Sequence, residues 1–390
     1  MGLARRVSRL GTETAFEVLA KARALEAQGK DIVHLEIGEP DFATPPHIVE
    51  AAVKALRDGY THYGPSAGLP EVREAIVRNV NRWRGTSFKP HQVIVTPGAK
   101  PIMFYTLLAM AERGAEVVYP NPGFPIYESM IRFCGAKAVP LRLPEEKGYH
   151  PDLKDLALKV NERTRLIILN SPHNPAGSVM SREEVETVAR LVLRYPDLYV
   201  LSDEVYKDIL YEGEHFSIAS VPGMEERTIL LDGFSKSYAM TGWRLGYGVF
   251  PEPFLTPVTR LVTNSVSHAA SFVQRAALAA LEGPQDAVAR MREEFRARRD
   301  LMLAGLSRIP GVRCPKPEGA FYLLPNIAGT GLKSREFQEM AMSEAGVALL
   351  SGASFGKYGE GYIRLSYANS RENLAKALER LERLVLGLAG

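Results

Sequence analysis

Several features that mark particular environments are scarce or missing in this chain of 390 residues. Its two cysteines, Cys134 and Cys314, stand alone without a CxxC spacing, so a disulfide framework or a metal site is not expected and a reducing cytoplasm is the default location. No apolar run approaches the length needed to cross a bilayer. The arginines near the N-terminus are not followed by the apolar core of a secretion signal. The sequence therefore predicts a cytoplasmic protein with no metal and no membrane partner.

An excess of charge of one sign is also missing, because the formal net charge is only +3. The richest basic stretch, residues 290–299, reads RMREEFRARR, and its two glutamates make it typical of a solvated helix face. We therefore expect no nucleic-acid partner. No GxGxxG follows an early strand, which argues against a nucleotide-binding dehydrogenase, and no internal repeat is present.

The chain does have an ordinary globular composition, with 46% hydrophobic and 24% charged residues, enough for a large core and two domains. Between residues 45 and 249, short apolar strands alternate with amphipathic helices. This pattern predicts an α/β fold with a mostly parallel sheet covered on both faces, whose ligands collect beyond the carboxyl ends of the strands. The expected helices include residues 49–56 and 69–83, and the expected strands are 93–96, 117–119, 166–170, 199–202, 229–231 and 245–249.

The C-terminal third has a different pattern, in which long helices enclose short strands, and it predicts a smaller α+β domain. A further helix expected at residues 14–28 has nothing of its own to pack on, so it joins the small domain or a partner subunit. We expect a large domain over residues 46–283 and a small domain formed by residues 1–45 and 284–390. The C-terminal helices are expected at 284–307, 334–344 and 372–388, and the strands at 320–324 and 362–367.

Residues 231–246, LDGFSKSYAMTGWRLG, hold the most informative pair of side chains, Lys236 and Arg244. A lysine captures a carbonyl group when desolvation or a nearby cation lowers its pKa, and an arginine binds a phosphate through its planar fork. Pyridoxal phosphate, an aldehyde with a phosphate group, requires both. An isolated pair of this kind is more often a solvated lysine in a loop, since lysines are mostly exposed, so the neighbouring candidates decide between the two interpretations.

Four residues could serve the ring of such a cofactor. Asp203 follows a strand, where a carboxylate can keep a pyridinium nitrogen protonated, although turn aspartates are common there. Tyr206 lies one helical turn further on and could reach the same ring, or it could be a packing residue. Asn174, in NSPHNPAG, could donate to the phenolic oxygen, in a path kinked by two X–Pro bonds, either of which could be cis. Phe124 could stack on the ring or belong to the core.

Other candidates would hold anionic groups. Gly98, Ala99 and Lys100 follow a strand and open a helix, whose free N–H groups form an anion site, with Ser235 as a further donor. Arg364 lies in the alternating strand YIRLSY. It is therefore either on a solvent-facing edge, the commoner case, or a bidentate clamp for a substrate α-carboxylate.

These segments together resemble the class I aminotransferases, which are fold type I pyridoxal phosphate enzymes. The resemblance covers nearly the whole chain, and the order and number of matching segments make it very specific. It implies transfer of an amino group from an amino acid to a 2-oxo acid by a ping-pong mechanism. The matching segments are IGEPDF (37–42), HYGPSAG (62–68), TPGAK (96–100), NPGFPIY (121–127), NSPHNPAG (170–177), SDEVY (202–206), FSKSYAMTGWRLGY (234–247), EGAFY (318–322) and YIRLSYA (362–368).

The resemblance also implies a role for each candidate. Lys236 would carry the cofactor covalently and move the proton of the substrate α-carbon, and Asp203 would face the pyridine nitrogen. Tyr63 would reach the phosphate in the neighbouring subunit, which implies a homodimer. Many members have a serine where this chain has Gly233, so a slightly weaker grip on the phosphate is expected. The remaining roles are the phenolic oxygen for Asn174 and Tyr206, ring stacking for Phe124, the phosphate for Arg244, Ser235, Gly98, Ala99 and Lys100, and the substrate α-carboxylate for Arg364, Asn174 and the backbone of Gly38.

The sequence leaves the choice of substrate more open. Lys100 matches a position where some aspartate aminotransferases place a lysine that contacts the distal carboxylate, which favours aspartate and glutamate with 2-oxoglutarate. Glu13, in GTETAFE, would repel an acidic side chain if it points inward, whereas Thr12 and Thr14 could bind one. A broader activity on alanine, aromatic or branched amino acids therefore stays open.

Two other classes share parts of this pattern. A β-lyase, a decarboxylase or a cyclopropane-forming synthase on the same fold would keep almost every residue named above. Some transcription regulators carry an aminotransferase-like domain after a DNA-binding segment. Only about thirty residues precede the start of the aminotransferase-like region, so we expect no such segment here.

Overall fold

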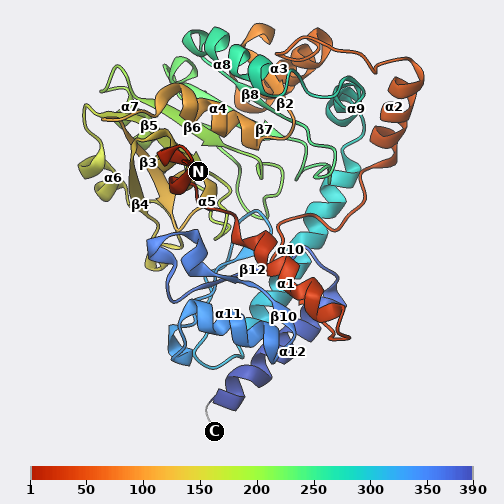
Figure 1. Cartoon of the computed structure of the whole chain (residues 1–390), viewed down its shortest axis with the longest axis vertical. Helices are drawn as coiled ribbons and strands as arrows, with labels where there is room; N and C mark the ends of the chain where they lie inside the picture. The colour runs from red at the N-terminus through yellow and green to blue at the C-terminus, as the bar shows by residue number, and fades with distance from the viewer. Residues whose placement is uncertain (1, 389–390) are drawn as a thin grey trace.

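The computed structural model describes residues 2–388 and has two parts, the larger of which is built on a seven-stranded sheet (Figure 1). The strand order is β2-β8-β7-β6-β5-β3-β4. Strand β8 runs antiparallel to both of its neighbours, β2 and β7, and the other described pairs of this sheet are parallel. The predicted mostly parallel sheet is therefore confirmed. The strands are β2 (Val93–Thr96), β3 (Glu116–Asn121), β4 (Lys137–Arg142), β5 (Thr164–Asn170), β6 (Tyr199–Asp203), β7 (Thr228–Gly233) and β8 (Gly246–Val249).

Strand β4 is the one member of this sheet that the sequence did not predict. It lies at the edge and reads KAVPLR, with exposed and buried positions alternating. A proline is tolerated there because an edge strand has N–H groups that no neighbour needs. The strands β2, β3, β7 and β8 are buried at every position, which is why their continuous apolar runs were easier to recognise.

Helices cover both faces of the sheet, and alternate strand residues separate the two faces. Ile94, Leu201 and Ile229 pack towards α4, α5 and α8. Their neighbours Val95 and Leu230 pack towards α2, α3 and α9, while α6 and α7 cover the part of that face nearer β4. The helices are α2 (Pro46–Arg57), α3 (Pro70–Arg84), α4 (Lys100–Met110), α5 (Pro125–Cys134), α6 (Leu153–Lys159), α7 (Arg182–Val192), α8 (Glu252–Ser265) and α9 (Ser271–Glu282).

The smaller part packs helices against short strands, and α10 runs from the larger part into it (Figure 1). The N-terminal helix α1 buries Ala15, Val18 and Ala22 against Met342 and Leu350 of this part, so its packing surface lies within the same chain. The predicted domain boundary at residue 283 falls between α9 and α10, and the division into two domains stays a prediction. The elements are α1 (Thr14–Glu26), α10 (Asp286–Leu306), α11 (Ser334–Ser343), α12 (Arg371–Leu388), a sheet of β11 (Leu350–Ser351), β12 (Ile363–Ser366) and β9 (Tyr322–Leu323), and the pair β1 (Val33–His34) and β10 (Val347–Ala348).

One expectation about α10 was wrong. Residues 290–299 do not form a wholly solvated face, because Arg298 and Arg299 are buried. Arg298 Nη1 lies 2.6 Å from Asp41 Oδ1 and its guanidinium stacks over Phe42. The IGEPDF segment packs on this side of the helix. Because this segment is distant in sequence, the charge pattern of residues 290–299 alone could not show that it buries them. No helix within residues 2–388 is long and apolar enough to span a bilayer.

Candidate active site

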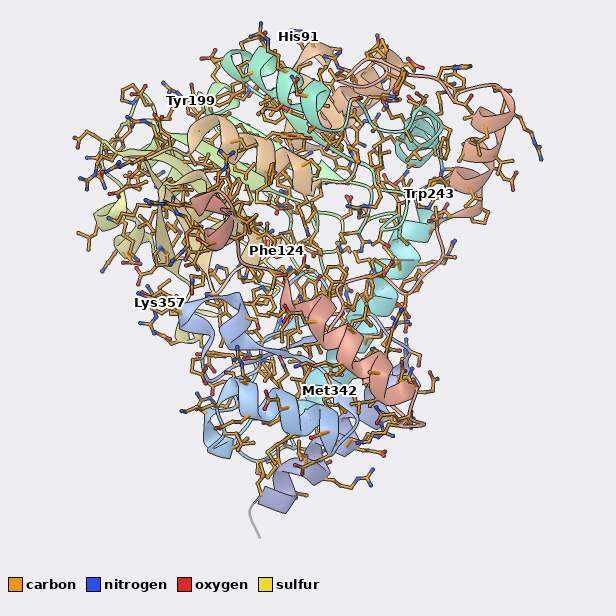
Figure 2. All side chains as sticks on the ribbon, in the orientation of Figure 1. His91, Phe124, Tyr199, Trp243, Met342 and Lys357 are labelled. Carbon is orange, nitrogen blue, oxygen red and sulfur yellow. The ribbon has the colours of Figure 1, made fainter. Side chains whose placement is uncertain are left out.

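A cavity of about 540 Å³ lies at the carboxyl ends of the parallel strands, where the two parts of the chain meet. Neighbouring strands deliver side chains to it, since Asn170 at the end of β5 pairs in register with Asp203 at the end of β6. Phe124, which lines the cavity, is labelled in Figure 2. The structure brings eleven of the predicted site residues into the cavity wall: Gly38, Ala99, Lys100, Phe124, Asn174, Asp203, Tyr206, Ser235, Lys236, Arg244 and Arg364.

Two predicted residues lie outside that wall. Gly98 is directly behind it, with a φ of +83°, and a Cβ atom there would collide with the guanidinium of Arg244. The position therefore requires glycine, for both its conformation and its close contact. Tyr63 is 90% exposed and makes an edge contact with His268, with ring centroids 5.6 Å apart. Within this chain Tyr63 does not reach the cavity.

Lys236 enters the cavity from the loop that follows β7. Its Nζ donates a hydrogen bond of 2.6 Å to the carbonyl oxygen of Gly38. Burial lowers the pKa of Lys236 to about 8, and the nearby cations Arg364 and Arg244 lower it further, against the opposing effect of two carboxylates. A larger share of the amine is therefore uncharged near neutral pH, as a carbonyl-capturing lysine requires.

Asp203 is the last residue of β6 and is buried. The hydroxyl of Tyr127, on α5, donates a hydrogen bond of 2.5 Å to its Oδ2. Burial raises the pKa of Asp203 to about 6, although the hydrogen bond from Tyr127 opposes this rise. No lysine, arginine or histidine among residues 2–388 forms an ion pair with Asp203. A buried carboxylate with room beside it and no cation is suited to a cationic ligand.

Tyr127 and Tyr322 were not singled out from the sequence. Tyr127 lies three residues after Phe124, which directly precedes α5, and the two rings are in edge contact with centroids 5.6 Å apart; this short spacing was the available signal. The hydroxyl of Tyr322 lies 2.8 Å from that of Tyr206. A Cβ on Gly38 would collide with the Tyr322 ring, so the glycine allows the N-terminal segment to pass close to the cavity.

Arg364 is buried in β12, the central strand of the three-stranded sheet, so the alternative of a solvent-facing edge arginine is wrong. Its Nη2 donates to the carbonyl oxygen of Glu36, its Nη1 lies 3.5 Å from Asn174 Oδ1, and its Nε has no partner. The ring of Tyr322 stacks on its guanidinium at 4.7 Å. No carboxylate within the described residues pairs with it. A buried guanidinium that lacks a counter-charge is suited to an anionic ligand.

The opposite end of the cavity also favours an anion. Helix α4 begins at Lys100, and its first N–H groups have no partners within the helix. Arg244 has a positive φ of +53° and donates from Nη1 to the carbonyl oxygen of Thr241 at 2.7 Å. This conformation brings its guanidinium against Gly98 beside the helix start. Arg244 therefore lies where helix dipole and side-chain charge act together.

Glu13 points into the cavity and pairs with Lys100. Their Oε2 and Nζ atoms lie 2.8 Å apart, and Lys100 also lies over the ring of Phe124 at 5.4 Å. The N-terminal segment crosses here because it is held at both sides. The N–H of Gly11 donates to Ser129 on α5, while α1 packs on the smaller part. Of the alternatives at this segment, the inward-pointing Glu13 is the one observed.

Comparison with known proteins agrees with this geometry. The profile of the family described as "Aminotransferase class I and II" matches residues 30–381. The aspartate aminotransferase of Pyrococcus horikoshii is 39% identical over 99% of this chain and 97% of its own length. The aspartate/prephenate aminotransferase of Thermus thermophilus is 41% identical over the whole of both chains.

Solved structures give the same result. An aspartate aminotransferase from Thermus thermophilus with maleate superimposes with a TM-score of 0.94 at 40% identity, covering 98% of this chain and 100% of the other. An aromatic aminotransferase from Pyrococcus horikoshii has a TM-score of 0.89 at 40% identity, covering 94% and 99%. The chain belongs to the class I and II aminotransferase family. It is an enzyme that transfers an amino group between an amino acid and a 2-oxo acid.

Proposed function

We propose that the enzyme works with pyridoxal phosphate held in the 540 Å³ cavity. The observation that carries this proposal is the set of three groups facing one space. They are the Lys236 amine with a pKa lowered to about 8, the Asp203 carboxylate without a cation, and the Arg364 guanidinium without a carboxylate. When bound, the cofactor supplies an aldehyde that captures amino groups and a ring that withdraws electrons from the substrate α-carbon.

The residues present fit the cofactor group by group. Asp203 would pair with the pyridinium nitrogen, which would return its carboxyl to the ionised form. Phe124 would lie against the ring, and Asn174 and Tyr206 would contact the phenolic oxygen. Arg244, Ser235 and the amides from Gly98 to Lys100 would hold the phosphate. A side chain at position 233 would be crowded, since a Cβ there would lie 3.2 Å from the Gly246 backbone, so the phosphate would depend on these other donors.

The chain's own side chains then account for the transfer of a proton. Arg364, supported by Asn174, would bind the substrate α-carboxylate beside the backbone of Gly38. This orientation puts the α-carbon within reach of Lys236. Lys236 Nζ would accept the α-proton as a general base and return it as a general acid.

For the substrate we propose aspartate and glutamate, with 2-oxoglutarate as the usual acceptor. The names of the full-length relatives and the position of Lys100 support this pair. A second candidate, a broad activity that includes aromatic and other apolar amino acids, is favoured by one observation. Lys100 is already neutralised by Glu13, and Phe16 and Met103 add apolar surface nearby.

We also propose a cytoplasmic homodimer in which Tyr63 completes the phosphate site of the partner. Its exposure of 90% in the single chain leaves its side chain accessible to a second subunit, which is compatible with this role. Light scattering of the purified protein tests the assembly. If a Tyr63→Phe variant binds the cofactor as tightly as the wild type, the hydroxyl of Tyr63 does not have the proposed role.

The decisive experiment is a visible spectrum of the purified protein before and after addition of aspartate, followed by borohydride reduction and peptide mapping. We expect a coloured protein, a change in the spectrum with aspartate, and an adduct on Lys236. A Lys236→Ala variant should lose the adduct, while Lys54→Ala, at an exposed lysine on α2, should keep it. Colourless protein without an adduct would contradict the proposal.

The same preparation distinguishes the transferase from lyases on this fold. We expect a 2-oxo acid product only when a second 2-oxo acid is supplied. Release of ammonia, or loss of the substrate side chain without an acceptor, would instead indicate a lyase.

A further inference from the structure

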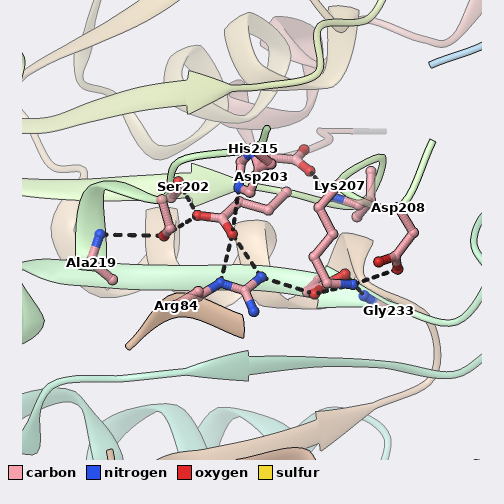
Figure 3. Close-up of polar contacts among 12 residues, drawn as sticks. Arg84, Ser202, Asp203, Lys207, Asp208, His215, Ala219 and Gly233 are labelled. Carbon is pink, nitrogen blue, oxygen red and sulfur yellow. Dashed lines mark hydrogen bonds and ion pairs between the residues drawn. The ribbon is translucent and has the colours of Figure 1, made fainter. Parts of the chain in front are cut away.

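A second cluster of charges is formed by residues that are neighbours in sequence of the cavity wall (Figure 3). Arg84, at the end of α3, lies between two buried carboxylates. Its Nη2 is 2.7 Å from Glu204 Oε2 and 3.2 Å from Asp232 Oδ2. Lys207 Nζ lies 3.0 Å from Asp232 Oδ2 and 2.8 Å from Asp208 Oδ2. We call these five residues the buried ionic cluster.

Polar neighbours complete the cluster. Glu204 Oε1 accepts hydrogen bonds of 2.9 and 2.5 Å from the hydroxyls of Ser202 and Ser217, and His215 Nε2 lies 3.0 Å from its Oε2. Tyr247 donates to Asp232 Oδ2 at 2.8 Å. Buried charges are costly unless they are paired and hydrogen-bonded, and here each carboxylate has several partners. Such a cluster holds the chain segments that carry it in one arrangement.

Each of three members is adjacent in sequence to a residue of the cavity wall. Glu204 follows Asp203, Lys207 follows Tyr206, and Asp232 precedes Gly233. At the ends of β6 and β7, successive residues of the extended chain point to opposite sides, so Asp203 and Gly233 face the cavity while Glu204 and Asp232 enter the cluster. Tyr206 and Lys207 divide in the same way within the turn that follows β6.

The cluster also reaches the loop that carries Lys236. The hydroxyl of Ser237 donates a hydrogen bond of 2.6 Å to Asp208 Oδ2, the same oxygen that pairs with Lys207. At the start of the loop, the N–H of Gly233 donates to Asp232 Oδ1 at 2.7 Å. The loop is therefore held on both sides of Lys236, at Gly233 and at Ser237.

We propose that Asp208 and Ser237 are positioning residues for Lys236, which hold its loop against the turn of Tyr206 and keep water from the amine. The inference rests on the proposed function only for the role of Lys236. The contacts themselves do not depend on that function. The hydroxyl of Ser237, beside Lys236, bonds to the carboxylate of Asp208, which also pairs with Lys207 beside Tyr206.

This arrangement has a measurable consequence for the acidity of Lys236. Burial is the largest cause that lowers its pKa, and the charged groups that face it are Glu13, Glu39, Arg364 and Arg244. None of those four belongs to the buried ionic cluster, so removing the Ser237–Asp208 contact leaves them in place. A looser loop would admit water and move the pKa of Lys236 back towards its ordinary value.

The test compares the variants Ser237→Ala and Asp208→Asn with Glu116→Gln. Glu116 is a buried carboxylate at the opposite end of the sheet, with hydrogen bonds from Asn161 at 3.0 Å and Lys137 at 3.1 Å. Like Asp208, it is a hydrogen-bonded carboxylate that pairs with a lysine, but it does not line the cavity. In full-length protein freed of any cofactor, the rate of amine labelling at Lys236 is followed against pH by peptide mass spectrometry.

We expect the labelling midpoint of both cluster variants to rise by about half a pH unit or more, and the rate of amino transfer to fall about tenfold. Glu116→Gln should lower the thermal midpoint without moving the labelling midpoint. If all three variants keep the wild-type labelling midpoint, the cluster is only structural and the proposal is wrong. Should Asp208→Asn fail to fold, Ser237→Ala, which removes a single hydroxyl, decides alone.

The labelling does not depend on a cofactor. A failure of the proposed function would appear separately, as a wild-type protein with no adduct on Lys236 after borohydride treatment.

Discussion

The hydroxyl of Tyr127 donates a hydrogen bond to the carboxylate of Asp203 across 2.5 Å, and it joins α5 to the end of β6. The bond favours the ionised form of Asp203 in a site where burial acts the other way. Tyr127, 76 positions away in sequence, therefore helps to keep the carboxylate of Asp203 in the charged form that pairs with a cationic ring.

We therefore predict that Tyr127→Phe weakens cofactor binding. Loss of the hydrogen bond should raise the pKa of Asp203 further and reduce the affinity for pyridoxal phosphate about tenfold, as expected for one hydrogen bond to a charged group. Equilibrium titration of cofactor-free protein measures this affinity. Tyr105→Phe is a matched control, because Tyr105 is also buried and bonds to Ser265 outside the cavity. Equal affinities for the two variants would contradict the prediction.

Arg364→Lys should weaken substrate binding more than it slows turnover. Lysine keeps the positive charge but not the planar fork that binds a carboxylate at two points, so the KM for every amino acid should rise about 10–100-fold. Steady-state kinetics with several amino acids gives both constants. Arg313→Lys, at a side chain that is 73% exposed, should change neither. If the KM of Arg364→Lys equals that of the wild type, Arg364 does not bind the substrate carboxylate as proposed.

The pair between Glu13 and Lys100 leads to a prediction about substrate choice. Glu13→Gln removes a negative charge and frees Lys100, so kcat/KM for aspartate should rise several-fold while that for phenylalanine stays constant. Lys100→Ser should have the opposite effect and reduce turnover of aspartate far more than that of alanine. Parallel kinetics with the three amino acids measures the ratio. If both variants change all substrates equally, neither residue selects the side chain.

Two histidines predict how stability depends on pH. His34 Nδ1 lies 2.7 Å from Glu36, and His150 Nδ1 lies 2.9 Å from Glu184. These hydrogen bonds raise the pKa of both histidines to about 9. Because the pKa is higher in the folded chain than in the unfolded chain, the stabilisation is complete below about pH 6.5 and is lost as the pH rises through about 9.

We expect the thermal midpoint at constant ionic strength to fall over this range, with about 1 kcal/mol lost per histidine. Calorimetry across the pH range measures the change. A His34→Gln, His150→Gln double variant should be less stable at pH 6 and show a flatter profile. If the thermal midpoint of the double variant depends on pH in the same way as that of the wild type, groups other than these histidines cause the dependence.

Much of the secondary structure could be predicted because its signals are local. The run at residues 93–96 is the observed β2 without change, and the helix predicted at 334–344 is α11 to within one residue. Both are set by hydrophobic periodicity and by the residues that end an element. The two X–Pro bonds in NSPHNPAG are both cis, as was considered possible, and Asn121–Pro122 is a third.

The buried arginines were harder to predict, because the same local sequence is compatible with solvent or with burial. Arg364 stands in an alternating strand in either case, and only the flanking strands β11 and β9 enclose it. Arg298 and Arg299 lie in a charged helix whose neighbours come from the N-terminal third and from a loop near residue 212. A charge pattern records composition along the chain, whereas burial depends on which distant segments pack there.

The sequence by itself determined the order of strands and helices and the segment that carries Lys236, because periodicity and turn chemistry act over a few residues. Only the tertiary structure decided that Tyr127 supports Asp203, that Tyr206 pairs with Tyr322 and that Glu13 neutralises Lys100. These contacts join positions 76, 116 and 87 residues apart. Their geometry follows from how the two parts of the chain pack around one cavity, which no short stretch of sequence encodes.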